Sequence, residues 1–244
     1  MSVPRLEVFG IPGLPEVAPG DRLAELVASA CAADPELALA DGDVVVVTQK
    51  VVSKAEGAMA DVDPDDPLSH KPLVERESVR ILRRRGELII SETRHGFVCA
   101  NAGIDLSNVD RGRAALLPED PDRSARRVRD GIRGRTGSAV GVIVSDTFGR
   151  PWRRGVTDVA IGSAGLRPVL DLRGTQDAYG RELQVTEVAV VDEIAGAADL
   201  VMGKATGVPV AIVRGVGPEA FLPDGERAGV LTDVVRSPAE DLFR

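Results

Sequence analysis

Residues 139–155 read AVGVIVSDTFGRPWRRG, so an apolar run passes directly into polar and arginine-rich sequence. The run at 139–144 is typical of a buried strand, and Asp146 and Thr147 would emerge together where that strand ends. A carboxylate beside a hydroxyl supplies the oxygen ligands that Mg²⁺ or Mn²⁺ prefers. The arginines that follow suit phosphate or carboxylate groups, which a guanidinium binds through two parallel hydrogen bonds. The segment therefore indicates phosphoryl-transfer chemistry, while an ordinary turn coated with solvated arginines is an equal alternative.

Along the rest of the chain, short apolar runs and amphipathic segments alternate irregularly. We expect strands at 5–9, 44–48 and 209–214, and helices at 22–33, 73–85, 122–133 and 185–202. No P-loop pattern occurs, and no Gly-x-Gly-x-x-Gly follows a strand. The expected fold class is mixed α/β with α+β character, and neither a Rossmann nor a P-loop fold.

Composition excludes several classes of protein. The 244 residues are 43% hydrophobic and 28% charged, which is ordinary for a soluble globular protein. A net charge of −8 argues against a nucleic-acid partner, which requires a basic surface. No apolar run approaches the roughly 18 residues that span a bilayer, and the start of the chain lacks a signal-peptide layout. Two cysteines form neither a disulfide framework nor a zinc motif, so the sequence predicts a reduced, cytoplasmic protein without a membrane partner.

A second acidic segment, residues 99–109, again places an aspartate after a short apolar run. Asp105 and Asp146 could form one divalent-cation site with Thr147, provided that the fold brings them together. By spacing alone, residues 105–108 are an equally good helix cap or Asx turn. Lys54, shortly after the 44–48 strand, is placed to act as a point charge on a phosphate, although a surface lysine is the commoner interpretation.

Taken in order, five segments resemble the F420 γ-glutamyl ligase family, also called coenzyme F420-0:L-glutamate ligases. They are residues 13–17, 42–57, 95–109, 145–155 and 192–204. No single segment is decisive, but five in sequence order are specific. The resemblance implies the fold of that family and a ligase that uses GTP with Mg²⁺ or Mn²⁺, with K⁺ as a further candidate cation. Such a ligase adds L-glutamate to F420-0 or dehydro-F420-0 through an acyl-phosphate intermediate, and the resemblance also implies a homodimer.

Residue by residue, the resemblance implies that Asp105, Asp146 and Thr147 are metal ligands. It places Asp105, Asp146 and Arg150 in catalysis. The nucleotide would contact a larger set: Leu14, Pro15, Glu16, Val17, Gln49, Lys50, Lys54, Asn108, Met202, Gly203 and Lys204.

The predicted domain organisation is a ligase-like domain at residues 1–236. Residues 237–244 would be a linker or tail, or the start of a C-terminal flavin-binding domain such as two-domain members of the family carry. Two other functions remain open from the sequence. One is a non-catalytic nucleotide-binding module that regulates an attached flavin domain, and the other is a different metal-dependent phosphoryl-transfer enzyme, such as a nucleotide phosphatase.

Overall fold

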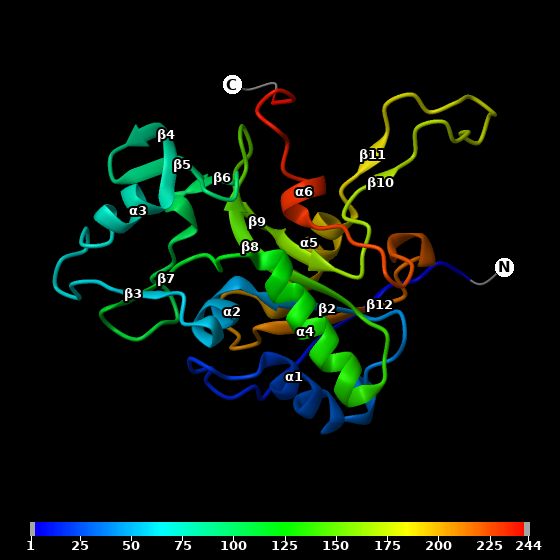
Figure 1. Cartoon of the computed structure of the whole chain (residues 1–244), viewed down its shortest axis with the longest axis horizontal. Coiled ribbons are helices and arrows are strands. Elements are labelled where there is room, and N and C mark those ends of the chain that lie inside the picture. The colour runs from blue at the N-terminus through cyan, green and yellow to red at the C-terminus, as the bar shows by residue number, and fades with distance from the viewer. Residues whose placement is uncertain (1–2, 242–244) are drawn as a thin grey trace.

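A five-stranded sheet organises the computed structural model, which describes residues 3–241 (Figure 1). Its strand order is β1 (Glu7–Gly10), β12 (Val210–Arg214), β2 (Val44–Thr48), β8 (Gly141–Gly149) and β9 (Val156–Ala164). Within this sheet β2 and β8 are parallel, and the other neighbouring strands are antiparallel. The expected strands at 44–48, 139–144 and 209–214 are therefore neighbours at the centre of the molecule.

Helices cover both faces of this sheet, which explains why its central strands are continuous apolar runs. The helix α4 (Pro121–Thr136) packs on β8 and β9 and also contacts α1 (Leu23–Ala32). On the opposite face, α5 (Val190–Met202) packs on β9, β1 and β12 (Figure 1). Residues 44–47 are consequently buried completely, and the main hydrophobic core lies on the two sides of β2 and β8.

Three smaller sheets surround the central one. An antiparallel sheet of β4 (Ser78–Arg85), β5 (Leu88–Thr93) and β6 (Val98–Ala100) packs with α3 (Lys71–Glu77) around a separate small core. The other two are strand pairs, β3 (Met59–Asp61) with β7 (Arg113–Ala115), and β10 (Leu170–Asp171) with β11 (Glu187–Val188). The short helices α2 (Gln49–Glu56) and α6 (Val230–Asp233) complete the mixed α/β fold that the sequence predicts. None of the helices described is long and apolar enough to cross a membrane.

Two predicted helices are wrong in part. Residues 73–85 were expected to form one helix, but α3 ends at Glu77 and β4 follows immediately. The left-handed Gly86 (φ +57°) allows a tight turn, so that residues 78–85 pair with β5 instead of continuing the helix. The helix expected from residue 185 begins at Val190, because residues 187–188 pair with β10.

Candidate active site

One wall of the site is α2, which begins directly after the last residue of β2. Lys50 and Lys54 are four residues apart and therefore lie on the same face of this helix. The sequence predicts Lys54 near a strand end, and the structure places it in the last turn of α2. The buried Gln49 donates its amide hydrogens to Ser53 Oγ and to the carbonyl of Leu116, both at 2.7 Å. These bonds fix α2 against the segment that follows β7.

The β8–β9 hairpin supplies the opposite wall. Ser145 and Thr147 are two residues apart on β8, so their side chains leave the same face of the strand. Both hydroxyls donate to one carboxylate on β9, because Ser145 Oγ lies 2.9 Å from Asp158 Oδ2 and Thr147 Oγ1 lies 2.5 Å from Asp158 Oδ1. The Thr147 hydroxyl gives its hydrogen to Asp158, so its oxygen is free to accept, and the ammonium of Lys204 donates to it.

Asp105 reaches the site from a loop with an unusual backbone. Asn101 (φ 50°), Ala102 (φ 54°) and Gly103 (φ 71°) are three consecutive left-handed residues just before it. Asp105 then forms a two-bond antiparallel bridge with Ala115 at the end of β7. The loop is thereby anchored to the same segment that Gln49 holds, which explains how a residue far from α2 in sequence comes to lie beside it.

A cavity of about 370 Å³ lies between these walls. Asp105 and Asp146 both line it, which answers the question that spacing alone left open. The predicted residues that line the cavity are Leu14, Pro15, Glu16, Val17, Gln49, Lys50, Lys54, Asp105, Asn108, Asp146, Thr147, Gly203 and Lys204. Met202 is buried at the end of α5 and lies behind this lining. Arg150 is exposed at the β8–β9 turn, where its Nη2 donates to the carbonyl of Arg154 at 2.9 Å, and it does not line the cavity.

Lysine is rare in this chain, yet it is concentrated here. The chain has four lysines, and Lys50, Lys54 and Lys204 line the cavity. Lys50 Nζ lies 2.9 Å from Asp105 Oδ2, Lys54 forms an ion pair with Glu16, and Lys204 Nζ lies 3.8 Å from Asp158 Oδ1. Lysine presents a compact, strongly hydrated charge that suits a phosphate, whereas most cations elsewhere in this protein are arginines. The cavity is therefore a place where carboxylates and ammonium groups neutralise each other.

Asp146 is a weakly compensated carboxylate of the cavity. Burial, helped by the neighbouring Asp105 and Asp158 carboxylates, raises the pKa of Asp146 to about 7, although the backbone N–H of Thr147 and the Lys204 ammonium lower it. Desolvation and like charges both disfavour the ionised form of a carboxyl group. In the described part of the chain, no lysine or arginine forms an ion pair with Asp146. A cation bound beside Asp146 would offset the free-energy cost of ionising this buried carboxyl group.

The side chains fit a divalent cation that brings most of its own ligands. Among the described residues, no group of three or more histidine, cysteine, aspartate or glutamate side chains is arranged to hold a metal ion. Mg²⁺ is usually held by one or two carboxylates together with water and substrate phosphates, and not by a closed protein cage. Asp105, Asp146 and the acceptor oxygen of Thr147 match that donor set, so their assignment as metal ligands stays a prediction that the geometry permits.

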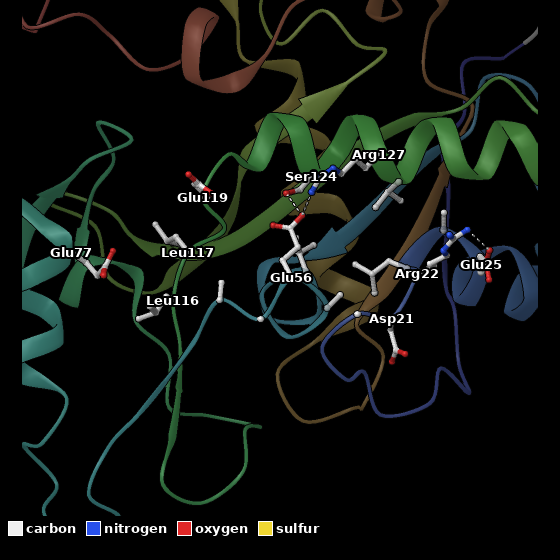
Figure 2. A pocket seen from close by; sticks show the side chains of 18 of the residues that line it. Asp21, Arg22, Glu25, Glu56, Glu77, Leu116, Leu117, Glu119, Ser124 and Arg127 are labelled. Carbon is white, nitrogen blue, oxygen red and sulfur yellow. Dashed lines mark hydrogen bonds and ion pairs between the residues drawn. The ribbon is translucent and has the colours of Figure 1, made fainter.

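A larger cavity, of about 800 Å³, lies on the other side of α2 (Figure 2). Its charged side chains mostly engage one another: Glu56 accepts from Ser124 Oγ at 2.7 Å and lies 3.7 Å from Arg127. Arg22 and Glu25 likewise form an ion pair. Because none of the predicted nucleotide or metal residues lines this larger cavity, size alone does not identify the site, and the smaller cavity has the relevant chemistry.

Ser145, Asp158 and Asp199 also line the cavity and are not among the predicted site residues. Asp158 is only 3% exposed and fixes two hydroxyls of the site, yet it lies within β9, outside the segments that the sequence singles out. A carboxylate within an otherwise apolar strand was the available signal, because a buried charge requires partners.

The fold and this cavity define a mixed α/β protein with a carboxylate and lysine site at the carboxyl ends of its parallel strand pair, β2 and β8. A family model described as F420-0:Gamma-glutamyl ligase matches residues 13–215. The protein called coenzyme F420:L-glutamate ligase in Methanopyrus kandleri is 44% identical over 258 residues, which cover 100% of this chain and 99% of that protein. Its namesake in Methanothermobacter thermautotrophicus is 47% identical over 225 residues, with 86% and 89% covered, and that of Methanocaldococcus jannaschii is 39% identical over 259 residues, with 98% and 97% covered. The chain belongs to the F420-0:gamma-glutamyl ligase family.

Proposed function

We propose that this chain is a ligase that joins L-glutamate to coenzyme F420-0 or dehydro-F420-0, with GTP as the source of energy and an acyl phosphate as the intermediate. The observation that carries the proposal is the convergence of Asp105, Asp146 and three of the four lysines on one cavity. The relatives' shared name supports the acceptor and the amino acid. The choice of GTP rests on the family resemblance, which also supports a homodimer.

The chemistry requires a carboxylate of the acceptor to attack the γ-phosphate, although both groups are negative. Lys50, Lys54 and Lys204 would lie along the triphosphate as fixed positive charges and reduce that repulsion. A divalent cation, when bound through Asp105, Asp146 and Thr147, would neutralise further charge on the phosphates. The attack breaks the bond between the γ-phosphorus and the oxygen that bridges it to the β-phosphate, so GDP leaves and the acyl phosphate forms. The neutral amine of L-glutamate then attacks the acyl phosphate, which forms the amide and releases phosphate and a proton.

Asp158 would act as a positioning residue in this site. It holds the hydroxyls of Ser145 and Thr147 so that the Thr147 oxygen presents its lone pairs to the cavity. The backbone N–H of Thr147 donates to Asp146 Oδ1 at 2.8 Å and fixes the orientation of that carboxylate. Groups that are already positioned in this way stabilise the transition state, because they do not have to reorient when charge develops on the reacting atoms.

The decisive experiment is mass spectrometry of the acceptor after incubation with GTP, Mn²⁺ and L-glutamate. We expect products spaced by one glutamyl residue, and no GDP when acceptor and glutamate are left out. GDP formation without acceptor would favour the phosphatase alternative, and nucleotide binding without turnover in the complete mixture would favour the regulatory module. Replacing GTP by ATP in a parallel reaction tests the choice of nucleotide.

Asp146→Ala is expected to lower the ligase rate by roughly two or more orders of magnitude while the protein stays folded. The exposed Asp130→Ala on α4 is the matched control, because Asp130 lies outside the cavity and forms an ion pair with the neighbouring Arg129. Near-normal glutamylation by the Asp146 variant would contradict the assignment of the site.

A further inference from the structure

The turn between β8 and β9, residues 149–155, is named here the β8–β9 tip. It continues the two strands that carry Asp146, Thr147 and Asp158, and it projects beyond the central sheet (Figure 1). All seven of its residues are exposed, and Trp152 is 85% exposed. The tip therefore places three arginines and an indole in solvent immediately beyond the candidate site.

The charge of the tip is uncompensated. Most arginines of this acidic protein form ion pairs with carboxylates, as Arg214 does with the buried Asp43. Within residues 3–241, none of the guanidinium groups of Arg150, Arg153 and Arg154 forms an ion pair with a carboxylate. Three adjacent positive charges on a protein of net charge −8 make a local site for an anion, because within the described residues no carboxylate forms an ion pair with them.

The backbone of the tip is held in a defined shape. Trp152 has a φ of 59°, a conformation that bulky residues rarely adopt, and Gly155 has a φ of 85°. The bond from Arg150 Nη2 to the carbonyl of Arg154 closes the turn. At the base, Phe148 packs edge to face against Phe97, with ring centroids 6.0 Å apart. The arginines are thus carried on a constrained turn with an anchored stem, and strained residues of this kind are common in ligand-binding segments.

The size of the cavity indicates what the tip contacts. A cavity of about 370 Å³ is at the lower end of ligand pockets, and in the proposed reaction it must hold a triphosphate and the reacting carboxylate of the acceptor. The remainder of the acceptor must extend outside it. Arg150 follows Thr147 by three residues, which corresponds to about 10 Å along a strand. The tip lies within the reach of an extended acceptor whose carboxylate is beside Asp146.

We propose that the β8–β9 tip binds the part of the acceptor that extends beyond the cavity, with Arg153 and Arg154 on an anionic group of the acceptor. Guanidinium groups recognise carboxylate and phosphate groups through paired hydrogen bonds. The inference rests on the proposed function and extends it, because it assigns the acceptor subsite to residues outside the cavity.

The test compares two pairs of alanine substitutions in the whole chain. One is Arg153→Ala with Arg154→Ala, and the other is Tyr179→Ala with Arg181→Ala. The second pair removes an exposed aromatic residue and an arginine from the arm between β10 and β11, where Tyr179 is 89% exposed. Binding of F420-0 is measured by titration and its KM by initial rates, together with the KM for GTP and for L-glutamate.

The tip pair is expected to weaken F420-0 binding and raise its KM by roughly tenfold or more, with the KM for GTP changed less than about threefold. Added salt should weaken F420-0 binding to the wild type more than to the tip pair, because two charges are missing. The arm pair should behave as the wild type does, and thermal unfolding confirms that each variant is folded.

An unchanged KM for F420-0 in the tip variants, or an equal loss in the arm pair, would overturn this inference and leave the proposed function standing. A parallel loss of GTP binding would also overturn it, because the tip would then act on the site as a whole. If the wild type itself neither binds F420-0 nor forms a glutamylated product, the proposed function and this inference both fail.

Discussion

Replacing Lys50 by methionine should change the affinities for metal and nucleotide in opposite directions. In the structure the Lys50 ammonium occupies the position of a counter-ion to Asp105, at 2.9 Å from Oδ2, and also donates to Ser107 Oγ at 2.9 Å. A divalent cation that binds without nucleotide must displace this ammonium. In Lys50→Met the competing charge is absent, while the length of the side chain is nearly preserved.

The size of the effect follows from this geometry. At 2.9 Å and an effective dielectric constant of about 20, the attraction between unit charges is on the order of 6 kcal/mol. The side chain of Asp105 is 34% exposed, and a displaced ammonium recovers its hydration, so only part of this attraction opposes the metal. A net contribution of roughly 1.5–3 kcal/mol, the range for hydrogen bonds to charged groups, corresponds to about ten- to a hundredfold in affinity.

The assay is calorimetric titration of the nucleotide-free protein with Mn²⁺, followed by titration with GTP at saturating Mn²⁺. We expect Lys50→Met to bind Mn²⁺ alone roughly ten- to a hundredfold more tightly than the wild type and to bind GTP more weakly, because a phosphate contact is lost. Lys54→Met is the matched comparison, since Lys54 lies one turn away but pairs with Glu16. It should weaken GTP binding without strengthening Mn²⁺ binding. If Lys50→Met binds Mn²⁺ no more tightly than the wild type, the reasoning is refuted.

Three further predictions concern other parts of the molecule. Asp158→Asn should leave the fold intact and lower kcat by roughly 10- to 100-fold. The hydroxyls of Ser145 and Thr147 each donate to one oxygen of the Asp158 carboxylate, and asparagine keeps only one of these two acceptors. An unchanged kcat in steady-state assays would contradict the positioning role. Burial raises the pKa of the Cys99 thiol to about 12, whereas a thiol in an unfolded chain has a pKa of about 8.5. The contribution of this thiol to the free energy of unfolding should therefore be fully present below pH 8.5 and should be lost as the pH rises toward 12. Labelling of Cys99 at pH 8 should require denaturant. Rapid labelling of the native protein would argue against this burial. Gly162→Ala should lower the free energy of unfolding in urea by about 1–3 kcal/mol, because the added carbon meets the backbone at the start of α4. At Gly134 an added carbon meets no other atom, so Gly134→Ala should be neutral or stabilising. Equal stabilities of the two variants would refute this packing.

Local sequence was sufficient for the central strands and for the acidic residues at their ends. The runs at 44–48 and 139–144 are apolar along their whole length, which is required of strands covered on both faces. Asp146 and Thr147 follow from the same pattern, since the end of a buried strand is where polar side chains first appear. The expected helix at 73–85 failed because the arginine-rich sequence has good helix propensity, and pairing with β5 after the turn at Gly86 overrides such a preference.

The sequence by itself determined the fold class, the family and the identities of most cavity residues. Tertiary structure alone decided that Asp105 and Asp146 share a cavity, because their approach depends on the pairing of β2 with β8 and on the bridge from Asp105 to Ala115. It also decided the role of Asp158, whose partners lie on the neighbouring strand. Strand order and register are set by contacts between residues far apart in sequence, and no local pattern encodes which side chains those contacts bring together.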